Sequence, residues 1–119
     1  MPETMNQRSA FIVSDRTGLT AEAMAHSLLS QFPSVDFNIE TFTFVDTASK
    51  AADIVERCLD IQVTTGSAPL VFLTMVNAEQ RALFTAAVIG VFDLFDLFIG
   101  PMEARLGFGP FHTLGKPPG

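Results

Sequence analysis

Residues 70–76 read LVFLTMV, and six of these seven side chains are apolar. An apolar run without alternation is typical of a parallel strand that is covered on both faces. The turn-forming sequence TTGSAP comes directly before it, at residues 64–69. Because neighbouring parallel strands must be joined by crossover segments, this stretch predicts further strands and helices along the chain.

Three other segments have the pattern of strands. Residues 9–14 (SAFIVS) form a short apolar run typical of a buried strand. Residues 38–45 (NIETFTFV) alternate with a partly polar character, which favours a strand nearer an edge. A very short strand is expected at residues 91–92.

Helical periodicity follows each of these strands. Residues 19–32 and 46–62 carry apolar stripes, and residues 78–90 begin after Asn77, whose side chain pairs with Gln80 in a capping-box pattern. Asp53 and Arg57 are expected to form an ion pair on the second helix. The residues of the first two stripes are Ala21, Met24, Ala25, Leu28 and Phe32, then Ala51, Ile54, Val55, Cys58 and Leu59.

The last predicted helix differs from the others. Asp93 is expected to cap it, Asp96 lies in its first turn, and Pro101 should kink it. Its apolar residues point to more than one side. They are Leu94, Phe95, Leu97, Phe98, Ile99, Met102 and Leu106.

The alternation βαβαβαβα predicts an α/β fold: a small three-layer open sheet of four parallel strands with helices on both faces. Residues 9–107 are expected to form this single domain. Residues 1–8 are expected to be a disordered N-terminus, and the Gly/Pro-rich residues 108–119 a linker or tail.

Composition excludes several classes of protein. A net charge of −6 and only seven scattered basic residues argue against nucleic-acid binding and against an anionic membrane surface. A single cysteine fits a reducing cytoplasm. Twelve Phe without Trp or Tyr, in a chain that is 48% apolar, predict a surface covered by a partner, such as a second copy or a further domain.

The polar segment SDRTGLT, residues 14–20, follows the first strand. Ligands of open parallel sheets bind beyond the carboxyl ends of the strands, at the switch point in strand order. If the first strand is central, this segment meets the Asp46–Thr47 turn and the exit of residues 70–76, and Asp93 is a further neighbour. The candidate ligand-binding residues are Ser14, Asp15, Arg16, Thr17, Gly18, Thr20, Thr74 and Asn77.

Two interpretations of this segment stay open. Backbone N–H groups at Thr17–Thr20, with Arg16 beside them, suit a phosphate or a carboxylate. Alternatively, Thr17 or Thr20 caps a helix, Gly18 relieves a tight turn and Asp15 faces water.

Other candidates carry little chemistry. The stretch LGKPP lacks the P-loop pattern, because Pro110 stands at the first glycine position and Pro117 at the Ser/Thr position. His26 and His112 have no ligand set at metal-binding spacing. Cys58 lies on an apolar helical stripe, which favours a buried thiol over a nucleophile.

The chain resembles the N-terminal part of the regulatory-protein family of pyruvate, phosphate dikinase and phosphoenolpyruvate synthase. The matching stretches are SDRTGLTAE at residues 14–22, SQFP at 30–33, PLVFLTMVNAEQRALF at 69–84 and FDLFDLFIGPMEARLG at 92–107. Arg16 departs from the family pattern, which has a small residue there.

This resemblance implies a bifunctional regulator. Such proteins phosphorylate a threonine of the dikinase or synthase with ADP as donor, and they remove that phosphate by phosphorolysis, releasing pyrophosphate. Intact members carry a P-loop in a later domain, so the resemblance implies that ADP and phosphate bind outside this chain and that the chain alone is inactive. The alternatives are a free-standing flavodoxin-like module that binds an anion or nucleotide, and an oligomerisation domain.

Overall fold

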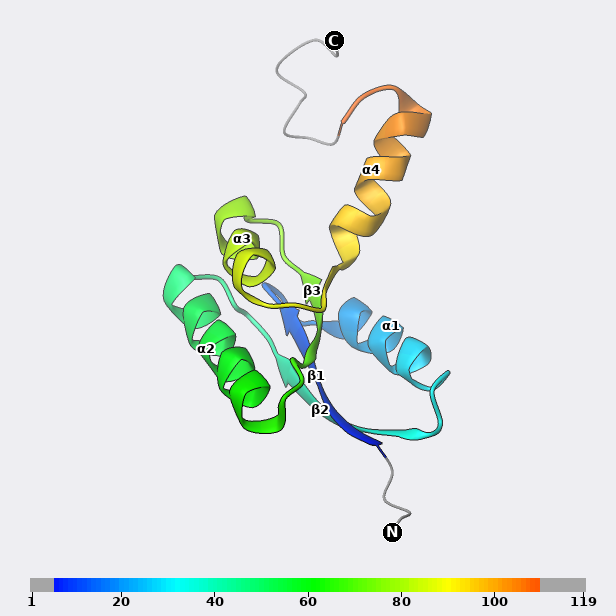
Figure 1. Cartoon of the computed structure of the whole chain (residues 1–119). Coiled ribbons are helices and arrows are strands. Elements are labelled where there is room, and N and C mark those ends of the chain that lie inside the picture. Colours follow the sequence, from blue (N-terminus) through cyan, green and yellow to red (C-terminus); the bar gives the residue numbers. More distant parts are fainter. Residues whose placement is uncertain (1–5, 110–119) are drawn as a thin grey trace.

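The computed structural model describes residues 6–109, which form a sheet with helices packed around it (Figure 1). Strands and helices alternate along the whole described chain. The elements are β1 (Asn6–Ser14), α1 (Leu19–Leu29), β2 (Val35–Phe42), α2 (Ala48–Thr65), β3 (Leu70–Thr74), α3 (Ala78–Ala87), β4 (Val91–Asp93) and α4 (Leu94–Leu106).

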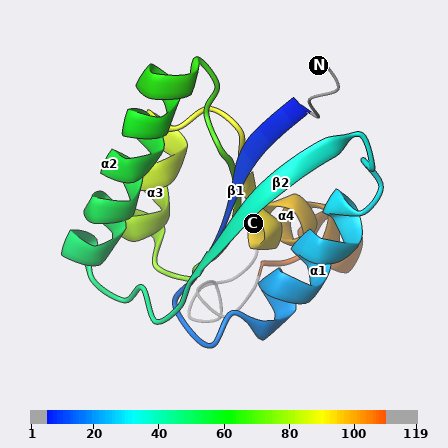
Figure 2. The ribbon, with the colours of Figure 1, turned by 90° about the horizontal axis from the view of Figure 1, so that it is seen from below.

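The four strands lie in the order β2-β1-β3-β4, and each neighbouring pair is parallel. Figure 2 shows α2 and α3 on one face of the sheet, with α1 and α4 on the side of the other face. The predicted α/β class with helices on both faces is confirmed. β1 and β3 occupy the two inner positions of the sheet. The apolar stretch 70–76 therefore contains a central strand, β3, as its composition predicts.

Each inner strand sends alternate side chains into two separate cores. Phe11 and Val13 of β1 face α2 and α3, whereas Ala10 and Ile12 face α1. The larger core also holds Val71, Leu73 and Met75 from the β3 segment, four residues of α2, and Phe84 of α3. The alternation follows from the two-residue period of a strand, so a strand covered on both faces must be apolar throughout.

The two strands of the first βαβ unit, β1 and β2, both begin earlier than expected. β1 starts at Asn6 and not at Ser9, so residues 6–8, expected to be disordered, pair with Val35–Phe37 of β2. β2 ends at Phe42 and not at Val45, because Phe44 takes a left-handed conformation with φ 54°. The expected tail at 108–119 lies mostly outside the described residues, as do residues 1–5.

The first helix also ends earlier than its apolar pattern predicts. α1 stops at Leu29, and the next N–H groups, those of Gln31 and Phe32, donate to carbonyls three residues back. This tighter turn rotates the following side chains away from the sheet. Phe32 is therefore 57% exposed. Leu28, within α1, is 45% exposed because the buried stripe of the helix runs through Ala21, Ala25 and Leu29. The predicted place of Phe32 and Leu28 on the buried stripe is therefore wrong.

The expected Asp53–Arg57 pair is replaced by a pair between α2 and β2. The two terminal nitrogens of Arg57 donate to the two carboxylate oxygens of Glu40 at 2.6 and 3.0 Å. The guanidinium carbon lies 5.4 Å from the Phe11 ring centroid and 5.5 Å from that of Phe42. A bidentate partner and two aromatic faces hold Arg57 better than one exposed neighbour on the same helix does.

The buried thiol of Cys58 gives stability a distinct dependence on pH. Burial raises the pKa of Cys58 to about 11 from its ordinary value of 9.0. Between these two pH values the unfolded chain releases the proton and the folded chain keeps it, so the free energy of unfolding falls as pH rises. We expect a fall on the order of 2 kcal/mol from this group across that window.

Urea denaturation followed by circular dichroism at pH 8 and pH 10.5 measures this effect, with Cys58→Ala as the comparison. The variant is less stable at both pH values, but its stability should fall less between them. Equal falls in both proteins would contradict the assignment.

Candidate functional site

The carboxyl ends of β1 and β3 form a polar rim at one edge of the sheet. The two strands are neighbours, but the helices that follow them, α1 and α3, lie on opposite faces. The Asp15 N–H donates to the Thr74 carbonyl at 3.3 Å, and the Asp15 carboxylate accepts from the Val76 N–H at 2.9 Å. This is the switch point in strand order, where ligands of such sheets bind.

The segment after β2 joins the same rim. The Phe44 N–H donates to the Arg16 carbonyl at 2.9 Å, and the Val45 N–H donates to the Ser14 carbonyl at 2.9 Å. Three chain segments therefore meet here, and the contacts of the third are made by Phe44 and Val45, directly before the predicted Asp46–Thr47 turn. We refer to residues 14–20, 43–45 and 74–77 as the rim.

The turn within the rim is built around Ser14 and Gly18. Ser14 is buried, and its hydroxyl accepts from the Arg16 N–H at 3.0 Å. Gly18 has φ 79°, a left-handed conformation that favours glycine, and a Cβ there would lie 3.4 Å from Cγ2 of Thr43. These two residues shape the turn that leads from β1 into α1.

The N-cap residue of α1 is Gly18, which has no side chain. The Thr17 hydroxyl accepts from the Leu19 N–H at 3.5 Å, and Thr20 lies within the first turn of the helix. Thr17 thus takes up one N–H group of the first turn, and the capping interpretation is wrong for Thr20. Arg16, Thr17 and Thr20 are exposed, so this helix start and its one cation face solvent at the switch point.

The rim residues that follow β3 mainly stabilise the fold. Thr74 is buried, and Asn77 Oδ1 accepts from the Gln80 N–H at 2.9 Å, as the capping pattern predicts. Because this oxygen already caps α3, Asn77 offers a ligand only its side-chain amide group.

The Asp46–Thr47 turn serves α2. Thr47 Oγ1 accepts from the Lys50 N–H at 3.1 Å, and the Asp46 carboxylate accepts from Lys50 Nζ at 2.9 Å. The hydrogen bond from Lys50, and then its charge, hold the pKa of Asp46 below its ordinary value. This turn closes the rim on the β2 side.

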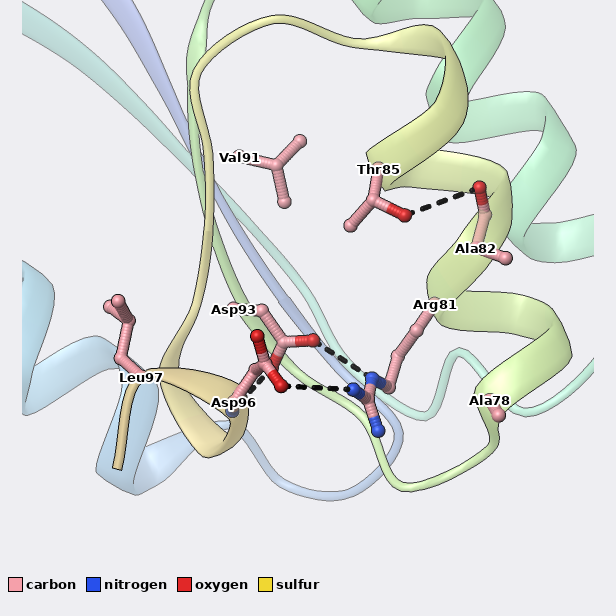
Figure 3. Close-up of a pocket in the computed structure, with 8 residues that line it drawn as sticks. All are labelled: Ala78, Arg81, Ala82, Thr85, Val91, Asp93, Asp96 and Leu97. Carbon is pink, nitrogen blue, oxygen red and sulfur yellow. Dashed lines mark hydrogen bonds and ion pairs between the residues drawn. The ribbon is translucent and has the colours of Figure 1, made fainter. Parts of the chain in front are cut away.

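A second group of polar residues, which the sequence did not single out as a set, lies beside β4 (Figure 3). Arg81 Nε donates to the buried Asp93 carboxylate at 2.8 Å, and the other Asp93 oxygen accepts from the Asp96 N–H at 3.1 Å, so the predicted cap is confirmed. Arg81 Nη2 lies 4.0 Å from Asp96 Oδ1. The surrounding cavity measures about 450 Å³ and is lined by Ala78, Arg81, Ala82, Thr85, Val91, Asp93, Asp96 and Leu97.

Arg81 had no local sequence signal, because its partner Asp93 is twelve positions away and approaches only when β4 joins the sheet. The Arg81 guanidinium lies between two carboxylates, that of Asp93 at 2.8 Å and that of Asp96 at 4.0 Å, so the cluster fixes α3 against β4 and the start of α4. The cavity is thus a feature of the open sheet edge, separate from the rim.

The remaining titratable candidates stay apart from the rim. His26 is exposed on α1, Cys58 is one of the buried residues of α2, and His112 lies outside the described residues. Within residues 6–109, no three His, Cys, Asp or Glu side chains gather closely enough to hold a metal ion. None of the helices in that range has the length and apolar character of a membrane span.

The sequence model of the kinase/pyrophosphorylase family matches residues 10–117. This chain belongs to the kinase/pyrophosphorylase family. The match includes the rim and all four helices. No solved structure matches the chain.

Curated relatives of this chain are provisionally named phosphoenolpyruvate synthase regulatory proteins. The protein from Alkalilimnicola ehrlichii is 45% identical over 95% of the chain and 41% of its own length. The proteins from Aromatoleum aromaticum and Bordetella pertussis are 41% and 42% identical over 92% and 98% of the chain, and over 39% and 42% of their own lengths. The chain thus spans about two-fifths of the length of the curated relatives it matches.

The Asp15 carboxylate should hold together the two chain segments that follow β1 and β3. We expect Asp15→Ala to lower the free energy of unfolding by about 1–2 kcal/mol, because the Val76 N–H loses a charged acceptor. Asp15→Asn keeps an acceptor oxygen and should lose less.

Urea denaturation followed by circular dichroism suits this chain, which has no Trp. Asp36→Ala is the matched control, because Asp36 is exposed on β2. If Asp15→Ala and Asp36→Ala lose equal stability, the hydrogen bond to Val76 does not stabilise the rim.

Proposed function

We propose that this chain is the rim-bearing part of a bifunctional regulator of phosphoenolpyruvate synthase or pyruvate, phosphate dikinase. The family match from residue 10 to residue 117 carries this proposal. The provisional names of the relatives support phosphoenolpyruvate synthase as the target. The target enzyme is thus the principal protein partner.

The proposed activity consists of two phosphoryl transfers. In the kinase direction a threonine hydroxyl of the target attacks the β-phosphorus of ADP, which leaves phosphothreonine and AMP. In the other direction inorganic phosphate attacks the phosphothreonine, which restores the hydroxyl and releases pyrophosphate. Both steps move a phosphoryl group between oxygen atoms, so catalysis depends on positioning and on neutralising negative charge.

The rim suits one part of this task, the binding of an anionic group. The start of α1 lies at the switch point, where Leu19 and Thr20 are exposed, and Arg16 is exposed on the turn that leads into it. A phosphate bound there would accept from backbone N–H groups and from a guanidinium. Ser14, Asp15 and Gly18 hold the turn in shape, and Thr17 and Thr20 add exposed hydroxyls.

The nucleotide site itself is proposed to lie in the part of the relatives outside the match. The sequence of this chain has no G-x-x-x-x-G-K-[ST] stretch, whose backbone and lysine would hold the phosphates of ADP. In this proposal the rim receives the phosphothreonine, phosphate or target surface, and the chain alone transfers no phosphoryl group.

The exposed rim also supports a second function, a free-standing module that binds a small anion. The exposed helix start at a switch point, with Arg16 beside it, is the observation that favours it. Calorimetric titration of this chain with ADP, phosphate and pyrophosphate separates the two functions. Tight binding of ADP by this chain alone would contradict the placement of the nucleotide site and favour the module.

The regulator function is tested with a chimera in which this chain replaces the aligned 113 residues of the Alkalilimnicola ehrlichii relative. Incubation with phosphoenolpyruvate synthase and ADP should yield phosphothreonine, measured by mass spectrometry, whereas this chain alone should yield none. In the chimera, Arg16→Ala should slow removal of the phosphate at least tenfold, and Arg105→Ala, an exposed change on α4, should not.

The intact relative serves as the positive control. If it modifies the synthase and the chimera does not, the proposed function is wrong for this chain. Equal rates for the Arg16→Ala and Arg105→Ala chimeras would remove Arg16 from the proposed anion site.

A further inference from the structure

Helix α4 extends beyond the carboxyl edge of the sheet and leaves most of its surface uncovered (Figure 1). Among its residues only Leu94, at the first position, is buried, in the core on the α1 face. The helix begins directly after β4, whose last residue Asp93 pairs with Leu73 of β3. Its free length therefore starts at the same edge as the rim.

The exposed side chains of α4 form an ordered apolar stripe. Phe95, Phe98, Ile99, Met102 and Leu106 stand at positions i, i+3, i+4, i+7 and i+11 of one helix. This spacing is the pattern of a helix face that packs against a core. Four of the five, all but Ile99, are between 41% and 60% exposed. We refer to these five residues as the α4 stripe.

The ends of α4 are defined by local capping residues, but few contacts hold the helix against the rest of the fold. Asp93 caps its start, and Gly107, with φ 87°, ends it. Pro101 lies within its 13 residues and has no N–H to donate. Helices of this length are marginal in water unless an apolar face is buried. The α4 stripe therefore requires a partner surface that residues 6–109 do not provide.

The handedness of the sheet indicates that α4 is not the crossover to a further strand beside β4. Crossovers between parallel strands are right-handed, and α3 lies on the α2 face in the step from β3 to β4. A further parallel strand beside β4 would need its helix on that same face. Because α4 begins on the α1 face, it is placed wrongly for that crossover, and its stripe is free to pack elsewhere.

We propose that the α4 stripe is the docking surface for the polypeptide that the longer kinase/pyrophosphorylases carry outside the matched residues, a proposal that rests on the proposed function. About three-fifths of the Alkalilimnicola ehrlichii relative lies outside its match to this chain. The family match runs through α4 to residue 117, so the stripe lies inside the family's own sequence. A second copy is the weaker occupant, because each copy brings a net charge of −6.

Docking on the α4 stripe would place that polypeptide beside the rim. Ser14 and Thr74 end their strands at the edge from which α4 rises. The cavity beside β4, with Thr85, Val91 and Leu97 in its wall, lies at the base of the helix and extends the contact surface. An anion on the rim and a nucleotide on the docked polypeptide would then face each other across one contact.

Amide hydrogen exchange by mass spectrometry tests the docking, with the chimera described above compared to this chain alone. Residues 95–106 should exchange rapidly in the chain alone and at least tenfold more slowly in the chimera. The chimera with Phe98→Glu should again exchange rapidly there, since glutamate keeps helix propensity but not an apolar contact. Phe32→Glu is the matched control, because Phe32 is 57% exposed and Phe98 53% exposed, and it should leave the slow exchange unchanged.

Slow exchange of β1 and β3 shows that each variant is folded, and Met102→Glu replaces Phe98→Glu if that variant is not. Equal exchange of α4 in the chain alone and in the chimera would overturn the docking proposal. So would a dimer of the chain alone, by analytical ultracentrifugation, with α4 already protected.

This readout is independent of catalysis. Slow α4 exchange in a chimera that makes no phosphothreonine would support docking and overturn the proposed function. Rapid α4 exchange in a chimera that makes phosphothreonine would support the proposed function and overturn the docking proposal.

Discussion

The parallel pairing of β1 with β3, with their following helices on opposite faces, is the constraint on which the rest of this structure depends. It requires residues 10–13 of β1 and 71–73 of β3 to be apolar, because these residues supply side chains to two cores. It also separates the segments that follow the two strands, and the Asp15 carboxylate joins these segments by accepting from the Val76 N–H. The polar rim is therefore a consequence of strand order.

Charge and apolar surface are distributed unequally around that sheet. The ion pairs that bridge elements, Arg57 with Glu40 and Arg81 with Asp93, hold helices against strands. The largest run of exposed apolar side chains lies instead on α4, which those pairs secure only at its base. A 12.9 kDa chain with this distribution has a stable centre and one surface that requires a partner.

Membership of the kinase/pyrophosphorylase family gives both surfaces a common explanation. A regulator that transfers phosphoryl groups has to bind an anion at one place and a nucleotide at another, and it has to bring the two together. The rim supplies exposed N–H groups and Arg16, and the proposed docking on α4 would supply the second site. Under the proposed function, the fold would separate the binding of an anion from the chemistry of ADP.

The sequence by itself determined the alternation of strands and helices, the parallel class, the caps at Asn77 and Asp93, and the family, because these depend on local pattern and spacing. Only the tertiary structure decided that Arg57 pairs with Glu40, that Arg81 meets Asp93, and that Gly18 is the N-cap residue of α1. These contacts join residues far apart in the chain or depend on the twist of a turn. Helical periodicity gave α4 an apolar face, but only the position of β4 at the open edge of the sheet left that face exposed.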